Sequence, residues 1–251
     1  MARPRRRVRN RALCAGAVLL GLFFTILAAV TVHSEPDIPF DRYGHVLFTQ
    51  GSLDAATKVQ QLPAVEVYLD LACSDCALTW PVLSQVVEAY GHQAEFLYRL
   101  FPLPYHRNAF TAAKAAKVVR LYSNSDDEVA SFFTAVFDGQ DRISNDATED
   151  LTQPDIEAVL GEWVTSATGV SMDAFKMGMS DDEVDTQTRY QFKYGCLHGV
   201  FGTPQVFIGG VLADGLDGEA TFQDWQDLLE PLVGGAATGA KFSGRAAMSI
   251  V

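Results

Sequence analysis

The sequence predicts an α/β fold in which a β-α-β unit and a β-β-α unit are separated by an all-helical insertion. Short β-rich runs precede and follow residues 108–200, where the apolar spacing is helical almost throughout. A Gly-Gly pair, Gly209-Gly210, joins the last two β-rich runs and is typical of a hairpin turn. The helices are expected to cover one sheet, so that both units form a single domain.

The first 34 residues have the composition of a targeting segment. Six arginines lie within the first eleven residues, and residues 12–32 after them carry no charge. This pattern is typical of a signal peptide, with cleavage near residues 32–34, and a run of this length can also span a bilayer as a signal anchor. Both alternatives stay open. Both place the folded body outside the cytoplasm, because the arginines stay on the cytosolic side.

The body of the chain is strongly acidic. The formal net charge is −12, so the residues that follow the six arginines carry −18. A body of this charge repels nucleic acid, and no basic stripe follows downstream. We therefore expect no nucleic-acid partner.

Residues 35–62 mix Pro, Asp, Gly and Gln, include one candidate short strand at 45–49, and form a lead-in to a domain at 63–233. In the first unit, the spacing predicts a strand at 64–71, a helix at 76–91 and a strand at 95–100. Within the insertion, the predicted helices are 108–122, 127–138, 154–166, 171–179 and 182–199.

The second unit is expected to contain strands at 205–208 and 211–213, followed by an amphipathic helix at 221–232. Residues 234–251 are rich in Gly, Ala and Ser, and are predicted to form a flexible tail. On the last helix, the spacing places four apolar residues on one side: Phe222, Trp225, Leu228 and Leu229.

Cys73 and Cys76 lie on the turn from the first strand of the domain into its first helix. Two thiols at this spacing can close a small disulfide ring, and a helix N-terminus favours the thiolate of the first one. This is the chemistry of thiol–disulfide exchange. Of the two other cysteines, Cys14 belongs to the targeting segment and Cys196 is a spare thiol, predicted to be a small buried apolar residue.

A Cys-x-x-Cys pair also occurs in zinc sites and in structural turns. Cys73, Cys76, Cys196 and His198 are residue types that could supply four zinc ligands. Cys-x-His is poor spacing for zinc, so no metal site is expected.

Three stretches, residues 65–76, 101–110 and 199–210, make the chain resemble the DsbA-like group of thioredoxin-fold thiol–disulfide oxidoreductases. The resemblance covers residues 60–232 and extends to eukaryotic members in particular. Members of this superfamily have a proline within the active-site helix, as at Pro81, and a cis-proline that faces the cysteine pair. Thr203-Pro204 occupies the latter position.

The resemblance implies a role for each matching residue. Cys73 would be the nucleophile and Cys76 the resolving thiol, with exchange through a mixed disulfide on Cys73. Thr203 and Pro204 would present backbone to an extended substrate peptide and keep metal from the thiolates. The partners would be protein or peptide thiols and disulfides, with an unidentified partner that recycles the redox pair. The cysteines are themselves the redox group, so no added cofactor is expected.

The sequence departs from this group at two positions. Oxidising members often have a histidine between the cysteines, whereas Asp75 lies there in this chain. A carboxylate disfavours a second negative charge, so we expect a higher Cys73 pKa than with a histidine, and a less oxidising reductase or isomerase. The second departure lies six residues before the nucleophile, where members of the group usually have a buried acid and this chain has Val67. Glu66 or Asp70 is left as a substitute proton relay.

Two further questions stay open at the level of sequence. His106 either tunes the acidity of the Cys73 thiol or has a structural role at the start of helix 108–122. Trp80 is expected in the core.

The alternative to an enzyme is a non-catalytic binding module of the same fold, in which Cys73 and Cys76 form only a structural disulfide.

Overall fold

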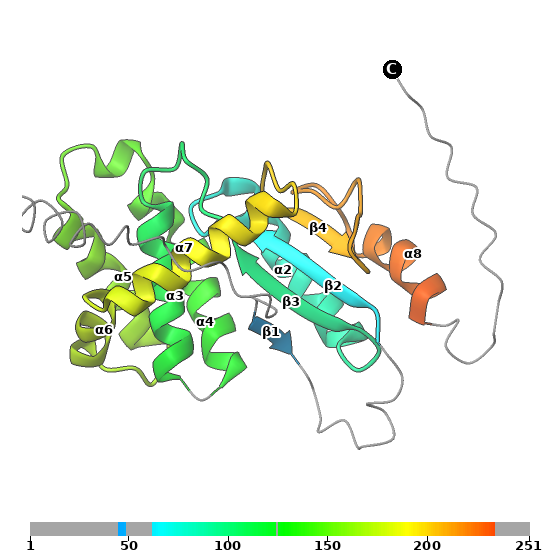
Figure 1. Cartoon of the computed structure of the whole chain (residues 1–251), viewed down its shortest axis with the longest axis horizontal. Coiled ribbons are helices and arrows are strands. Elements are labelled where there is room, and N and C mark those ends of the chain that lie inside the picture. Colours follow the sequence, from blue (N-terminus) through cyan, green and yellow to red (C-terminus); the bar gives the residue numbers. More distant parts are fainter. Residues whose placement is uncertain (1–44, 49–61, 124, 234–251) are drawn as a thin grey trace, which may run out of the picture. The chain divides into compact units, whose positions relative to one another are not determined.

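The computed structural model describes residues 45–48, 62–123 and 125–233 (Figure 1). The predicted targeting segment, most of the lead-in and the predicted tail lie outside these residues. In the described part of the chain, no helix combines the length and the apolar character needed to cross a membrane.

The described strands form one sheet, and its order confirms the predicted α/β fold with a helical insertion. β2 and β3, of the β-α-β unit, are parallel, and β4, of the β-β-α unit, pairs antiparallel with β2. The order across the sheet is β1 (His45–Phe48), β3 (Glu95–Leu100), β2 (Ala64–Leu69), β4 (Gln205–Ile208) and β5 (Val211–Leu212).

One face of the sheet is covered by α2 (Ser74–Tyr90), on which α8 (Phe222–Val233) packs. α2 begins two residues before the predicted start, because Cys73 is already its extended N-terminal cap, with φ −90° and ψ 126°. On α8, Trp225 and Leu229 are fully buried, whereas Leu228 is 39% exposed.

The other face of the sheet lies under α7 (Asp182–Leu197), which crosses it on the side opposite α2 (Figure 1). The close approach depends on Gly195, because a Cβ there would lie 2.5 Å from the ring of Phe101. α7 ends at Leu197, before the predicted residue 199. Gly199 follows with a φ of +73°, which a glycine adopts at little cost.

The insertion consists of α3 (Ala109–Tyr122), α4 (Asp126–Asp138), α5 (Gln153–Ala167), α6 (Met172–Met179) and α7. These bounds agree with the predicted helices to within two residues. Two 3₁₀ helices, η2 (Gln140–Ile143) and η3 (Asp146–Thr148), were not predicted, because single turns are too short to show a helical apolar period.

Trp80 links the insertion to α2, as expected of a core residue. Its ring lies 5.4 Å from that of Phe133 and 5.7 Å from that of Phe137, both on α4. Its indole N–H donates to the hydroxyl of Thr134, 2.9 Å away. Because α2 carries the cysteine pair at its start, this contact ties the insertion to the helix of the candidate site.

Candidate active site

The turn from β2 into α2 presents Cys73 at the N-terminus of the helix. The backbone N–H of Cys73 donates to the carbonyl of Asp70, and that of Ala72 donates to the Asp70 carboxylate, 2.8 Å away. Cys73 therefore occupies the cap position, where an acceptor side chain meets the unpaired N–H groups of the first helical turn.

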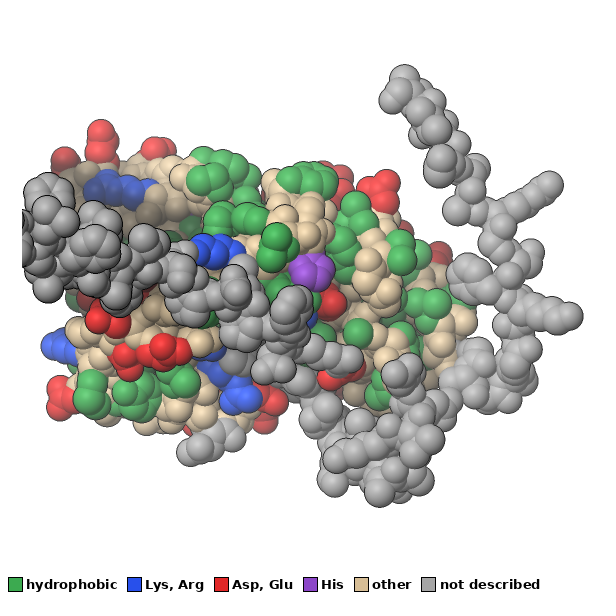
Figure 2. All heavy atoms as spheres, in the orientation of Figure 1, with side chains coloured by type: hydrophobic (Ala, Val, Ile, Leu, Met, Phe, Trp, Pro, Cys, Tyr) green, Lys and Arg blue, Asp and Glu red, His purple; other side chains and the backbone are tan. Residues whose placement is uncertain are grey.

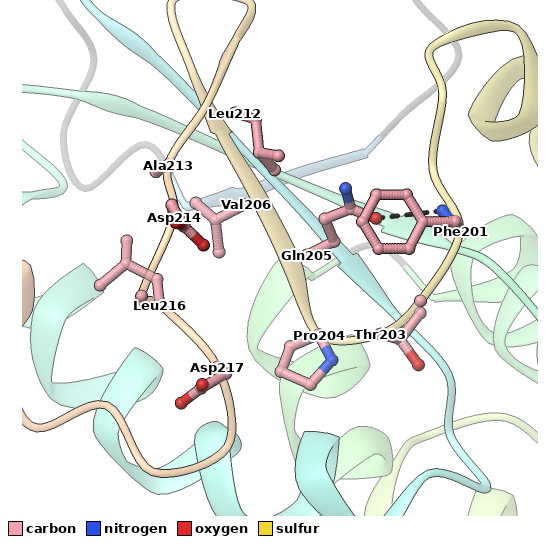
Figure 3. A pocket seen from close by; sticks show the side chains of 12 residues that line it. Phe201, Thr203, Pro204, Gln205, Val206, Leu212, Ala213, Asp214, Leu216 and Asp217 are labelled. Atoms are coloured by element: carbon pink, nitrogen blue, oxygen red, sulfur yellow. Dashed lines mark hydrogen bonds between the residues drawn. The ribbon is translucent and has the colours of Figure 1, made fainter. Parts of the chain in front are cut away.

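The structure brings the predicted substrate-binding pair to the predicted nucleophile. The Thr203–Pro204 bond is cis, as the resemblance implied. The Cys73 thiol lies 3.3 Å from the carbonyl oxygen of Thr203, 130 positions further along the chain. Figure 3 shows Thr203 and Pro204 at the end of β4.

The two thiols have opposite acidities. A hydrogen bond from Cys76 lowers the pKa of Cys73 to about 6, with further contributions from Thr203 and from the backbone N–H groups of Cys76 and Asp75. Burial opposes this shift. Burial also raises the pKa of Cys76 well above its ordinary value, and the neighbouring Cys73 adds to this rise. At neutral pH, Cys73 is therefore the thiolate and Cys76 the thiol.

The environment of Asp75 explains why its carboxylate does not prevent ionisation of Cys73. Asp75 is exposed, so water screens its charge, whereas its backbone N–H lowers the pKa of Cys73. Cys73 itself exposes only 6% of its surface, and the nearby donors act on a largely buried sulfur.

Asp70 is a buried polar centre directly behind the cysteine pair. Its side chain is fully buried and accepts the backbone N–H groups of Ala72 and Leu103, while the Nδ1 of His106 lies 2.7 Å from the same carboxylate. Its own backbone N–H donates to the sulfur of Cys76, 3.4 Å away. Burial raises the pKa of Asp70, and these hydrogen bonds act against that rise.

Glu66 and Asp70, the two residues predicted as substitutes for the missing buried acid, lie in different surroundings. Glu66 pairs with Arg99 in the strand β3, whereas Asp70 contacts the turn of the cysteine pair directly. The side chain of His106 contacts Asp70, and its backbone carbonyl accepts the N–H of Ala109, the first residue of α3, 3.1 Å away. This contact agrees with the predicted structural role at the start of that helix.

Gln140 is a residue of the site that was not predicted from the sequence. Its side-chain amide, on η2, donates to the carbonyls of Leu71 and Cys73 at 3.0 and 2.9 Å. These two bonds hold the cysteine turn from the side of the insertion. A single glutamine between two helices carries no sequence signal for a contact 67 positions away.

Cys196 was expected to be buried, but the structure places it on the surface at the end of α7. The expectation failed because Gly195, its neighbour, takes the position against the sheet. Among the described residues, no three His, Cys, Asp or Glu side chains lie close enough together to hold a metal ion.

The acidity of Cys73 predicts a pH profile. Alkylation of Cys73 by iodoacetamide, followed residue by residue with mass spectrometry, should rise with a midpoint near pH 6. In Cys76→Ala the midpoint should move up towards the ordinary value of 9.0, because the leading hydrogen bond is lost. Cys196→Ser is the matched control and should leave the midpoint in place. An unshifted midpoint in Cys76→Ala would contradict this assignment.

The same shift affects stability. The pKa of Cys73 is lower in the folded than in the unfolded chain, so its ionisation stabilises the folded dithiol form. This contribution is complete above about pH 9 and is lost as the pH falls to about 6.

Comparisons with known proteins agree with this geometry. The fold is shared with BdbD from Bacillus subtilis at 16% identity and a TM-score of 0.57, covering 74% of this chain and 91% of that one. It is also shared with the thiol–disulfide oxidoreductase MdbA from Actinomyces oris, at 18% identity and a TM-score of 0.56, covering 75% and 88%. The fold is shared as well with alpha-DsbA1 from Wolbachia pipientis, at 20% identity and a TM-score of 0.55, covering 71% of this chain and 89% of that one.

The comparison with curated proteins found no match. The family model for the DSBA-like thioredoxin domain matches residues 64–226, which include the cysteine pair, the insertion and the cis-proline. This match spans more than half of the chain and agrees with the strand order and with the geometry around Cys73. The chain therefore belongs to the DSBA-like thioredoxin domain family.

Proposed function

We propose that the chain catalyses thiol–disulfide exchange on protein substrates outside the cytoplasm. The observation that carries this proposal is the geometry of the two thiols: Cys73 caps the N-terminus of α2 beside the carbonyl of Thr203, and Cys76 is fully buried. This geometry lowers the pKa of Cys73 and raises that of Cys76. A disulfide that served only a structural role would need neither shift. The membership of the family supports the same chemistry.

The reaction proceeds in two balanced steps. The Cys73 thiolate attacks one sulfur of a substrate disulfide, which forms a mixed disulfide and releases the other substrate sulfur as a thiolate. Cys76 then gives up its proton and attacks the sulfur of Cys73, which forms the Cys73–Cys76 disulfide and releases the second substrate thiolate. Two electrons pass to the substrate, and the proton that Cys76 gives up goes to one of the two released thiolates. The other thiolate takes its proton from the solvent. The reverse sequence oxidises a substrate dithiol.

Thr203 and Pro204 are the proposed substrate-binding residues. The carbonyl of Thr203 lies beside the Cys73 sulfur, so a peptide that paired with this backbone would bring its own sulfur to the nucleophile. The substrates are protein or peptide thiols and disulfides. A second thiol–disulfide couple must recycle the pair, because each turnover leaves it in the opposite redox state.

The acidity of Cys73 bears on the direction of the reaction. Among related folds, the nucleophile has a pKa of about 7 in thioredoxin, a reductant, and about 3.5 in DsbA, a strong oxidant. A value of about 6 in this chain supports a couple less oxidising than DsbA, in keeping with Asp75 in place of a histidine. We propose a reductase or isomerase.

The proposed location rests on the N-terminal sequence alone. Six arginines followed by the uncharged residues 12–32 favour a cleaved signal peptide or a single membrane anchor, and both put the domain on the far side of the membrane. The further resemblance to eukaryotic members also stays a prediction.

The function is tested with the full chain and insulin as the disulfide substrate. With dithiothreitol as the recycling reductant, the protein should accelerate the appearance of free insulin B chain well above the rate with dithiothreitol alone. No acceleration in this assay, and none in the oxidation of a reduced ribonuclease, would contradict the proposal and favour a non-catalytic binding module.

A further inference from the structure

We propose that a hollow beside Thr203 and Pro204 selects substrate segments with a lysine or arginine close to their reactive cysteine. This inference rests on the proposed function and names the class of substrate that this site prefers. The occupant is an extended segment of a substrate polypeptide.

The hollow lies at the end of β4 and has a volume of about 250 Å³. Pro204 and Thr203 belong to its lining, and the carbonyl of Thr203 contacts the Cys73 sulfur. In Figure 3, Asp214 and Asp217 lie on one side of β4, and Phe201 and Gln205 on the other. The hollow is therefore next to the nucleophile, and both groups belong to its lining.

The wall formed by the loop after β5 is acidic. Asp214 and Asp217 line the hollow and are exposed to solvent. The same loop packs on the start of α2, since a Cβ at Gly218 would lie 2.9 Å from the Cβ of Asp75. The carboxylate of Asp75, between the two cysteines, thus belongs to the same side of the site.

The sequence segments that form this part of the sheet and the hollow contain no lysine or arginine to offset these carboxylates. Residues 59–98, which contain β2 and α2, include neither lysine nor arginine, and the same is true of residues 194–240, which contain β4, β5 and α8. The positive charge that complements the wall has to come from the bound segment.

Gln205 is an independent sign that the hollow receives a polypeptide. The residue is 93% buried, and its side-chain oxygen accepts the backbone N–H of Phe201, 3.1 Å away. Its amide nitrogen is buried and has no hydrogen-bond partner among the described residues. A buried donor left without a partner is costly, and a backbone carbonyl of a bound segment would satisfy it.

The remaining surface suits apolar side chains. Phe201 is 80% exposed and Leu212 is 44% exposed, and both line the hollow. Figure 2 shows hydrophobic side chains gathered at the surface where α7 leads towards β4, the segment that contains Leu197 and Phe201. The preferred segment therefore combines an apolar residue with a cation.

The test uses three cyclic disulfide peptides that differ only at the residue next to one cysteine, which is lysine, glutamine or glutamate. The full chain, in its dithiol form, reduces each peptide, and the rate constant is measured at low and at high salt. We expect the rate constant to be highest for the lysine peptide, lower for the glutamine peptide and lowest for the glutamate peptide. Each exchange of charge should change the rate about two- to fivefold at low salt, as for ion pairs at an exposed rim. High salt should bring the rates together.

A matched pair of variants locates the effect. Asp214 is exposed, and its side chain makes no hydrogen bond to another described residue. Asp214→Asn should therefore weaken the preference for lysine without breaking an internal contact. Asp214→Lys should reverse it. Asp173→Asn, on the exposed start of α6, changes the net charge equally and should leave the preference unchanged.

The outcomes separate the two proposals. Equal rates for the three peptides at low salt would overturn the inference and leave the proposed function intact. An equal loss of preference in Asp214→Asn and Asp173→Asn would also overturn it, because the net charge would then explain the effect. Failure to reduce even the glutamine peptide would contradict the proposed function itself.

Discussion

Cys73→Ser is expected to lower the rate of disulfide exchange to the uncatalysed background. The variant loses the sulfur that carries the mixed disulfide, and a serine hydroxyl cannot replace it. Cys76→Ser is expected to form the mixed disulfide but not to resolve it. A covalent complex with the substrate should then accumulate and dissociate on addition of dithiothreitol. The loss of rate in Cys73→Ser is measured in the insulin assay. The covalent complex of Cys76→Ser is measured without dithiothreitol, by non-reducing electrophoresis.

Cys196→Ser is the control for these two variants. Cys196 is exposed and lies outside the predicted redox pair, so the variant should retain the full rate. Unchanged exchange in Cys73→Ser would show that the pair is not the reactive centre. Equal loss in Cys196→Ser would show that the third thiol takes part in the reaction.

Asp70→Leu is expected to lower the free energy of unfolding by about 2–4 kcal/mol. The change leaves the N–H groups of Ala72 and Leu103 without their acceptor in a fully buried position, and it removes the partner of His106. Burial raises the pKa of Asp70, so removal of the charge recovers part of this loss. The measurement is urea unfolding of the reduced protein at neutral pH.

Asp70→Asn and Asp75→Asn provide the comparison. Asp70→Asn keeps one acceptor oxygen at the site and should lose less than Asp70→Leu. Asp75 is exposed, and its replacement should change stability by no more than about 0.5 kcal/mol. Equal stability of Asp70→Leu and the unmodified chain would contradict the role assigned to this carboxylate.

The sequence predicted the parts of the site that local patterns encode. Cys73 lies where a strand pattern changes into a helix pattern, and a proline follows in Pro81, so the turn and its chemistry were visible. Thr203 and Pro204 were assigned from a resemblance, and the structure brings Thr203 within 3.3 Å of the Cys73 sulfur.

Local sequence patterns did not predict the contacts between distant segments of the chain. Gln140 reaches the cysteine turn from the insertion and belongs to no motif. His106 was a candidate, but its contact with Asp70, 36 positions away, was not predicted. The burial of Cys196 was predicted wrongly for a related reason. Its type favoured burial, but the rotation of α7 puts Gly195 against the sheet instead.

The central claim is that Cys73 and Cys76 form a working redox couple, and its reduction potential tests that claim most directly. The full chain is equilibrated with glutathione buffers of known composition, and the fraction of the Cys73–Cys76 disulfide is read by mass spectrometry. A Cys73 pKa of about 6 predicts a value between those of thioredoxin, about −270 mV, and DsbA, about −120 mV. A potential below about −300 mV would mark an inert structural disulfide and contradict the account.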